Sequence, residues 1–205
     1  MSKTIRELVS LVFDTNFLIN YNSKVLETQE NAKKCFDYYS RRYQCSSFCS
    51  EIVIAEFDVY NDFSLFQENL NFKRLPFGSL ESKLCAQLSR QILDKKLTYK
   101  NAVFDSLMKG LDTDNSNKEK RKILDYIKDT IKDDLKILST YITHNGRVKK
   151  IFLTSDQELI AMAKDLDIEK EYNVKLVNYL SQTPEYEFLD LPLFGTNNDL
   201  DTSES

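Results

Sequence analysis

The sequence predicts an α/β protein with a central, mostly parallel sheet of four or five strands flanked by helices. Short apolar runs alternate with segments of helical periodicity at both ends of the chain, and parallel strands need such helical crossovers between them. The alternation opens with an apolar run, Leu11-Val12-Phe13, that meets the polar residues Asp14-Thr15-Asn16. With 205 residues, 41% of them hydrophobic, the chain can bury one core, so we expect one domain that carries an insertion.

The elements of the first half follow from apolar spacing, cap residues and turn residues. The first to be expected are a strand at about 9–13, helices at about 16–26 and 32–43, a strand at about 45–49, and a helix through 51–57 that Ser50 caps. After these we expect a helical piece at 63–70, a short strand at 74–77 closed by Gly78, and a helix at about 80–93.

The second half contains the most regular helical pattern of the chain. Apolar residues recur every three or four positions from Ile123 to Ile142, which predicts a long amphipathic helix over about 118–143 that stops at Asn145-Gly146. A strand at 150–154, a helix at 155–165 and a final strand at 174–178 are expected after it. We therefore predict a domain over residues 1–182 with an insertion at about 94–130, followed by an acidic, disordered tail over 183–205.

Composition excludes several classes of protein. The net charge of −4 argues against a protein that coats nucleic acid by bulk charge. No apolar run approaches the roughly 20 residues of a membrane helix, and no signal-peptide core follows the first residues, so a cytoplasmic location is expected. The four cysteines are irregularly spaced and His144 is the only histidine, which predicts reduced, packed thiols and no zinc tetrad.

Four separated acidic residues are candidates for a site, and each also has a purely structural interpretation. Asp14 follows the first strand and could cap a helix; Glu56 could lie on a solvated helix face. Asp134 could pair with a lysine, and Asp156 could be a helix N-cap. Ligands in open α/β sheets bind outside the carboxyl ends of the strands, which is where Asp14 is expected.

The order of these acids and the elements beneath them resemble the PIN-domain nucleases, the family of the VapC-like toxin ribonucleases and their relatives. The segments that carry the resemblance are Val12-Phe13-Asp14-Thr15-Asn16, Ser50 to Glu56, Asp134 to Thr140 and Phe152 to Leu159. The resemblance covers about residues 9–180, apart from 94–130. Glu51 competes with Glu56 and Asp133 with Asp134, and Tyr141 stands where small residues are frequent in this helix of the family.

The resemblance implies a metal-dependent endoribonuclease that cleaves RNA phosphodiester bonds. Its catalytic and metal-binding residues would be Asp14, Glu56, Asp134 and Asp156, with Asn16, Thr154 and Ser155 in supporting roles; Asn16 could instead be a helix N-cap. Such an enzyme would use Mg²⁺ or Mn²⁺, because these hard cations prefer carboxylate oxygens, and because the carboxylates would repel one another without a cation.

The resemblance also implies partners and leaves one alternative open. It implies single-stranded or structured RNA as the substrate, a protein antitoxin and a homodimer as candidate partners, and a role as the toxin of a toxin–antitoxin or defence system. The alternative is a catalytically weak or inactive PIN-like module that binds RNA or protein. Basic clusters at 41–42, 73–74, 95–96, 118–122 and 147–150 could bind phosphates, although most such runs are solvated faces. The last cluster is expected at the opposite end of its strand from Asp156.

Overall fold

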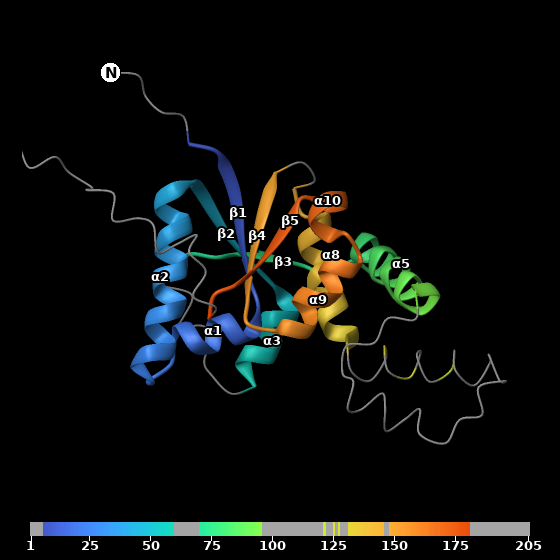
Figure 1. Cartoon of the computed structure of the whole chain (residues 1–205), viewed down its shortest axis with the longest axis horizontal. Helices are drawn as coiled ribbons and strands as arrows, with labels where there is room; N and C mark the ends of the chain where they lie inside the picture. Colours follow the sequence, from blue (N-terminus) through green and yellow to red (C-terminus); the bar gives the residue numbers. More distant parts are fainter. Residues whose placement is uncertain are drawn as a thin grey trace, which may run out of the picture.

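The computed structural model describes residues 6–59, 70–95, 121, 125, 127, 131–145 and 148–180. Its centre is a parallel sheet of five strands in the order β3-β2-β1-β4-β5 (Figure 1). The strands are β1 (Leu8–Phe13), β2 (Gln44–Ser50), β3 (Lys73–Leu75), β4 (Lys149–Thr154) and β5 (Val174–Asn178). The predicted α/β class and parallel sheet are therefore confirmed.

Helices separate the strands along the chain. Those whose bounds are described are α1 (Thr15–Tyr21), α2 (Leu26–Arg42), α3 (Glu51–Asp58), α5 (Ser79–Lys95), α8 (Lys132–Thr143), α9 (Gln157–Asp165) and α10 (Ile168–Tyr172). Each strand-to-strand connection can be parallel only because the chain returns through such helices.

The sheet is covered on both faces, as a parallel sheet requires. On one face, Phe13 of β1 packs against Phe17 of α1 and Phe36 of α2, with ring centroids 5.0 and 6.0 Å away. On the other face, Phe152 of β4 meets Tyr141 of α8 edge to face at 4.9 Å. Figure 1 shows α2 on one side of the sheet, and α8 with α5 on the other.

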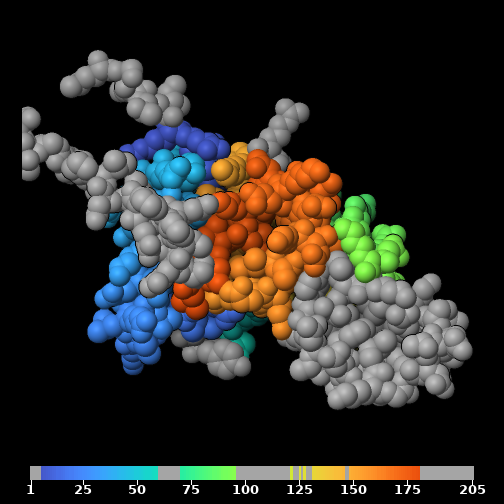
Figure 2. All heavy atoms as spheres, in the orientation of Figure 1, coloured from blue at the N-terminus to red at the C-terminus, as the bar shows by residue number. Residues whose placement is uncertain are grey.

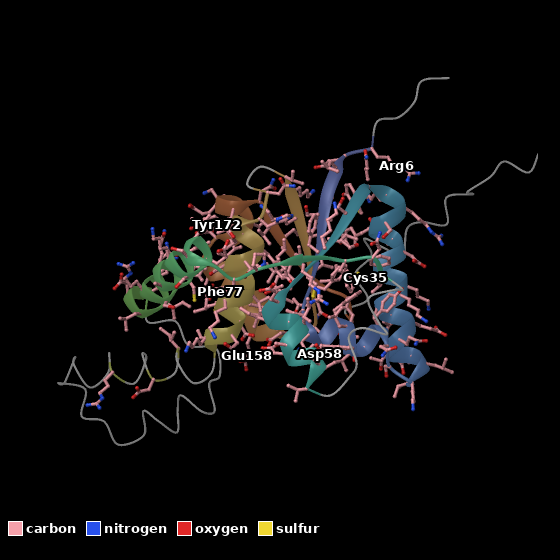
Figure 3. The ribbon with its side chains drawn as sticks, turned by 180° about the vertical axis from the view of Figure 1, so that it is seen from behind. Arg6, Cys35, Asp58, Phe77, Glu158 and Tyr172 are labelled. Atoms are coloured by element: carbon pink, nitrogen blue, oxygen red, sulfur yellow. The ribbon has the colours of Figure 1, made fainter. Side chains whose placement is uncertain are left out.

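The strand order places a topological switch point between β1 and β4. From β1 the chain first moves outward through β2 and β3, and it then returns to the other side of β1 to form β4 and β5. Loops that leave the carboxyl ends of β1 and β4 diverge to opposite faces, which opens a place for a ligand between them. In Figure 3, Asp58 at the end of α3 and Glu158 at the start of α9 lie at this carboxyl edge, opposite Arg6 at the amino edge.

Two boundaries differ from the sequence-based predictions. The helix expected over 16–26 ends at Tyr21, where the backbone N–H of Asn22 bonds to the carbonyls of Leu18 and Asn20. The Ser23 hydroxyl then accepts from the N–H of Val25, and α2 begins at Leu26 and not at the expected position 32, so the polar connection between the two helices lies earlier in the chain than predicted. Helix α10 was not predicted; its five residues are too few to show a periodic pattern.

Several expectations concern residues outside the described ranges. These are the helical piece at 63–70 apart from Leu70, most of the insertion at 94–130, and the tail at 183–205. In the described part of the chain all four cysteines are free thiols. No helix there combines the length and the apolar character that crossing a membrane requires.

Candidate active site at the carboxyl edge of the sheet

Asp14 is the most deeply buried acidic side chain at the carboxyl edge. It follows β1, caps α1, and is 5% exposed. Its Oδ1 accepts from the Thr15 backbone N–H at 2.8 Å, and its Oδ2 accepts from the Thr154 hydroxyl at 2.7 Å. One carboxylate therefore ties the end of β1 to the start of α1 and to the end of β4.

The pKa of Asp14 is raised from 3.8 to about 6. Burial is the main cause, and the negative charges of Asp156 and Glu56 raise the pKa further. The hydrogen bonds from Thr154 and Thr15 oppose this shift. Among the described residues, these effects together favour the neutral form of Asp14 over its ionised form.

Glu56 reaches the same place from α3. Ser50, at the end of β2, caps this helix by accepting from the Ile52 N–H at 3.2 Å. One and a half turns later, the Glu56 carboxylate accepts from the Thr15 hydroxyl. Its competitor Glu51 is exposed in the first turn of α3, so Glu56 is the α3 acid that the structure places beside Asp14.

Asp156 lies in the loop between β4 and α9 and caps α9. Its Oδ1 accepts from the N–H groups of Glu158 and Leu159 at 2.8 and 3.0 Å. Its own N–H donates to the Thr154 hydroxyl at 3.0 Å, so this hydroxyl bridges the loop of Asp156 to the carboxylate of Asp14. The structural interpretation as an N-cap holds for both aspartates, and it is compatible with a site because each cap points to the same edge.

Asp134 and Asn16 are placed differently from these three acids. Asp134 lies half-buried in the first turn of α8, a helix that carries none of these three acids. Its rival Asp133 is exposed and pairs with Lys136 at 2.5 Å. Asn16 is exposed in α1, and because Asp14 is the N-cap of that helix, the interpretation of Asn16 as a cap is wrong.

Two buried tyrosines that were not predicted as site residues join the segments of this edge. The Tyr141 hydroxyl donates to the Phe13 carbonyl at 2.5 Å and accepts from the Ser50 N–H at 3.2 Å. It thus connects the ends of β1 and β2, one residue before Asp14 and at the cap of α3. The large side chain of Tyr141, at a position where a small residue was expected, is accommodated in the core, where it is fully buried and makes these two bonds.

Tyr179 makes the corresponding connection from the end of β5. Its hydroxyl donates to the Asn16 carbonyl at 2.9 Å, lies 3.2 Å from the Ser155 hydroxyl, and accepts from the Asn20 amide at 2.5 Å. It therefore joins α1 to the loop that carries Asp156. The signal that could have found it is its position directly after a predicted strand, the same signal that selected Asp14 and Asp156.

The donor chemistry at this edge fits a hard divalent cation, although the side chains are not gathered into a coordination shell. Carboxylate oxygens are the ligands that Mg²⁺ and Mn²⁺ prefer, and the charges of Asp156 and Glu56 add to the burial that raises the pKa of Asp14. Within the described residues, however, no three His, Cys, Asp or Glu side chains form a group that could hold a metal ion. The carboxylates are held instead by threonine hydroxyls and by helix N–H groups.

Together the fold and the edge define an α/β protein with an acidic site at the switch point of a parallel sheet. No family model and no curated protein matches the chain. A solved structure that matches is that of VapBC2 from Rickettsia felis bound to a DNA fragment from its promoter. It is 14% identical and covers 82% of this chain and 98% of its own, with a TM-score of 0.44. The candidate site therefore depends on the residues and their geometry alone.

Proposed function

We propose that this protein is a metal-dependent endoribonuclease that hydrolyses RNA phosphodiester bonds at the carboxyl edge of its sheet. The observation that carries the proposal is the buried Asp14 at the switch point, whose pKa is raised by burial and by the charges of Asp156 and Glu56. A neutral ligand would gain nothing from this concentration of negative charge, whereas a divalent cation would compensate it.

Asp14, Glu56 and Asp156 would hold Mg²⁺ or Mn²⁺, with Asp134 added by the resemblance to PIN-domain nucleases. When bound, such an ion supplies positive charge beside the phosphate and lowers the pKa of water. In the hydrolysis, a water oxygen bonds to phosphorus, the bond from phosphorus to a ribose oxygen breaks, and the leaving oxygen gains a proton. Thr154 positions the Asp14 carboxylate, and the loop of Ser155 lies beside it.

A paired assay of wild type and Asp14→Asn tests the proposal. Purified proteins are incubated with single-stranded and structured RNA in Mn²⁺, in Mg²⁺ or in a chelator. Cleavage by the wild type in either metal, absent in the chelator and in the variant, is the expected result. Cleavage that persists in the chelator, or in Asp14→Asn, would refute the assignment.

A second candidate function is a PIN-like module that binds RNA or protein without cleaving. The observation that favours it is that no group of three metal-binding side chains is preassembled among the described residues, while Asp14 and Asp156 already serve as helix caps. Under this function, Mn²⁺ would neither raise the melting temperature nor support cleavage. Thermal melts with and without the metal separate the two functions.

A toxin role, a protein antitoxin, a homodimer and a cytoplasmic location belong to the proposal as predictions from the resemblance and the composition. A toxin of this kind should arrest growth when it is expressed alone, and Asp14→Asn should abolish the arrest. Growth that is unaffected by the wild-type protein would remove the toxin role and would leave the nuclease activity to be judged by the cleavage assay.

A further inference from the structure

Two basic segments that are far apart in sequence meet at the amino edge of the sheet, opposite the acidic site. Arg41 and Arg42 end α2, just before β2 begins, and Lys149 is the first residue of β4. Because β2 and β4 flank β1 on its two sides, the segments that enter these strands come together at one edge. Figure 3 shows Arg6, just ahead of β1, at this edge.

Tyrosine rings hold two of these cations in place. The Arg42 guanidinium lies 5.7 Å from the ring centroids of both Tyr38 and Tyr43, and its Nη1 donates to the Tyr38 hydroxyl at 2.5 Å. The Lys149 ammonium lies 5.7 Å from the same Tyr43 ring. Tyr43 is itself stacked on Tyr39, with centroids 6.2 Å apart. The two cations therefore lie over one fixed ring instead of extending freely into solvent.

Within the described ranges, no carboxylate forms an ion pair with Arg42 or Lys149. The neighbouring Arg41 does form one, with Asp37 at 4.0 Å. The Arg42 side chain stays exposed while its guanidinium is held by the tyrosines. An anion that binds here would meet oriented donors whose side-chain entropy is already reduced.

We propose that Arg42 and Lys149, placed by Tyr43, form an anchoring site for the phosphates of single-stranded RNA, separate from the place of cleavage. β1 has six residues, so the anchor lies roughly 20 Å from Asp14. The ring faces already carry the cations, so the site binds phosphate by charge and not by base stacking, and it is independent of sequence. The choice of RNA as the ligand depends on the proposed function, which this site would extend to long substrates.

Binding is measured on the full-length protein in the Asp14→Asn background with a chelator present, so that no cleavage occurs. A labelled single-stranded RNA is titrated at several salt concentrations against Arg42→Ala, Lys149→Ala and the double variant. The matched control is Lys83→Ala, which removes an equal charge from an exposed position on α5. We expect the double variant to lose about tenfold in affinity and its salt slope to fall by about 1.4, since each phosphate contact on a single strand contributes about 0.7.

A second pair of variants tests the role of the ring. Tyr43→Phe keeps the aromatic face and should bind as the parent does, whereas Tyr43→Leu removes it and should weaken binding although all cations remain. Melting curves establish that each variant is folded. Equal loss in Tyr43→Phe and Tyr43→Leu would overturn the role of the ring.

Other outcomes would overturn the site itself. These are a double variant that binds as tightly as its parent, or a Lys83→Ala variant that is weakened equally. Displacement of the RNA by polyglutamate at equal charge concentration would show a general surface for acidic proteins and would overturn the assignment to RNA. Because no cleavage is needed, loss of the proposed nuclease activity would leave this result standing, and the two failures are distinguishable.

Discussion

At the carboxyl edge of the sheet, acidic side chains are held by hydrogen-bond donors, whereas at the amino edge basic side chains lie over tyrosine rings. Asp14 is 5% exposed and accepts from Thr15 and Thr154; Arg42 is exposed and lies over Tyr38 and Tyr43. Both arrangements fix a charge at one end of the central strands, but only the acidic one places that charge inside the protein.

The two edges differ in how their charged side chains affect the free energy of the folded state. Burial raises the pKa of Asp14, so its ionised form destabilises the fold at neutral pH. An exposed cation above an aromatic ring keeps its hydration and contributes roughly 0.5–1 kcal/mol. A protein that retains the costly arrangement at one edge is expected to use it, which is the physical reason for placing the chemistry there. Figure 2 shows the C-terminal elements, in orange and red, between α2 and α5.

The largest expected effect comes from Asp14→Asn, which should reduce RNA cleavage below detection while stabilising the protein. The shift of the pKa from 3.8 to about 6 corresponds to a destabilisation of the folded state by about 3 kcal/mol. The variant should recover about 2 kcal/mol of this at pH 8, since the hydrogen bonds of an amide are weaker than those of a carboxylate. Because the folded-state pKa is raised, the gain is full above pH 6 and disappears as the pH falls toward 4. Urea unfolding at several pH values measures it, with the exposed Asp133→Asn as the control.

The ionisation of Asp14 should also control metal binding, because the charge that destabilises the metal-free protein would favour a bound cation. Under the proposed function, Mn²⁺ would bind only the ionised Asp14 carboxylate, so its apparent affinity should be constant above pH 6 and fall by about tenfold per pH unit below it. Titrations followed by the melting temperature would show this. An affinity that does not vary between pH 5 and 7 would remove Asp14 from the ligand set.

Tyr141→Phe tests whether the Tyr141 hydroxyl stabilises the ends of β1 and β2 at the acidic edge. The substitution leaves the buried Ser50 N–H and Phe13 carbonyl without the hydroxyl that joins them, which should lower the free energy of unfolding by about 2 kcal/mol. Tyr172→Phe, at the end of α10 where the ring is half-buried, serves as the matched control and should change it by less than about 0.5 kcal/mol. Equal losses of the free energy of unfolding in the two variants would contradict this role of the Tyr141 hydroxyl.

The smallest effect is expected at the amino edge. Arg42→Ala should change the free energy of unfolding by about 0.5 kcal/mol, because the cation that is removed is exposed, although the Tyr38 hydroxyl loses the bond that it accepts from Arg42. Urea unfolding in low salt is the measurement. A loss of the free energy of unfolding as large as that of Tyr141→Phe would show that the side chains of the amino edge stabilise the fold as much as those of the carboxyl edge.

Local patterns were sufficient to predict most of the fold. The strand expected at 174–178 is β5 (Val174–Asn178), and Ser50 caps α3 as predicted, because strand ends and caps depend on neighbouring residues. Helix ends were less predictable, since the turn after Tyr21 depends on the backbone bonds of Asn22 and Ser23.

The candidate site could be predicted only in part, because its assembly depends on strand order. Asp14, Glu56 and Asp156 meet because β1 lies between β2 and β4, an arrangement that no local pattern specifies. Asp134 lies in the first turn of α8, and its role in the site stays a prediction. Tyr179 was missed although it directly follows a predicted strand, because a tyrosine in that position indicates a site only once its hydroxyl is known to reach the Asn16 carbonyl.

The central position of β1 also determines when this molecule can finish folding. The hydrogen bond from Thr154 to Asp14 closes a loop of 140 residues, so β1 leaves the ribosome long before the strand that completes it. Contacts of such sequence separation form slowly, and the backbone N–H and C=O groups on one edge of β1 stay unpaired with β4 until β4 has been synthesised. A protein built in this way would assemble its acidic site last, and a chain truncated before β4 would lack that site and would expose a strand edge.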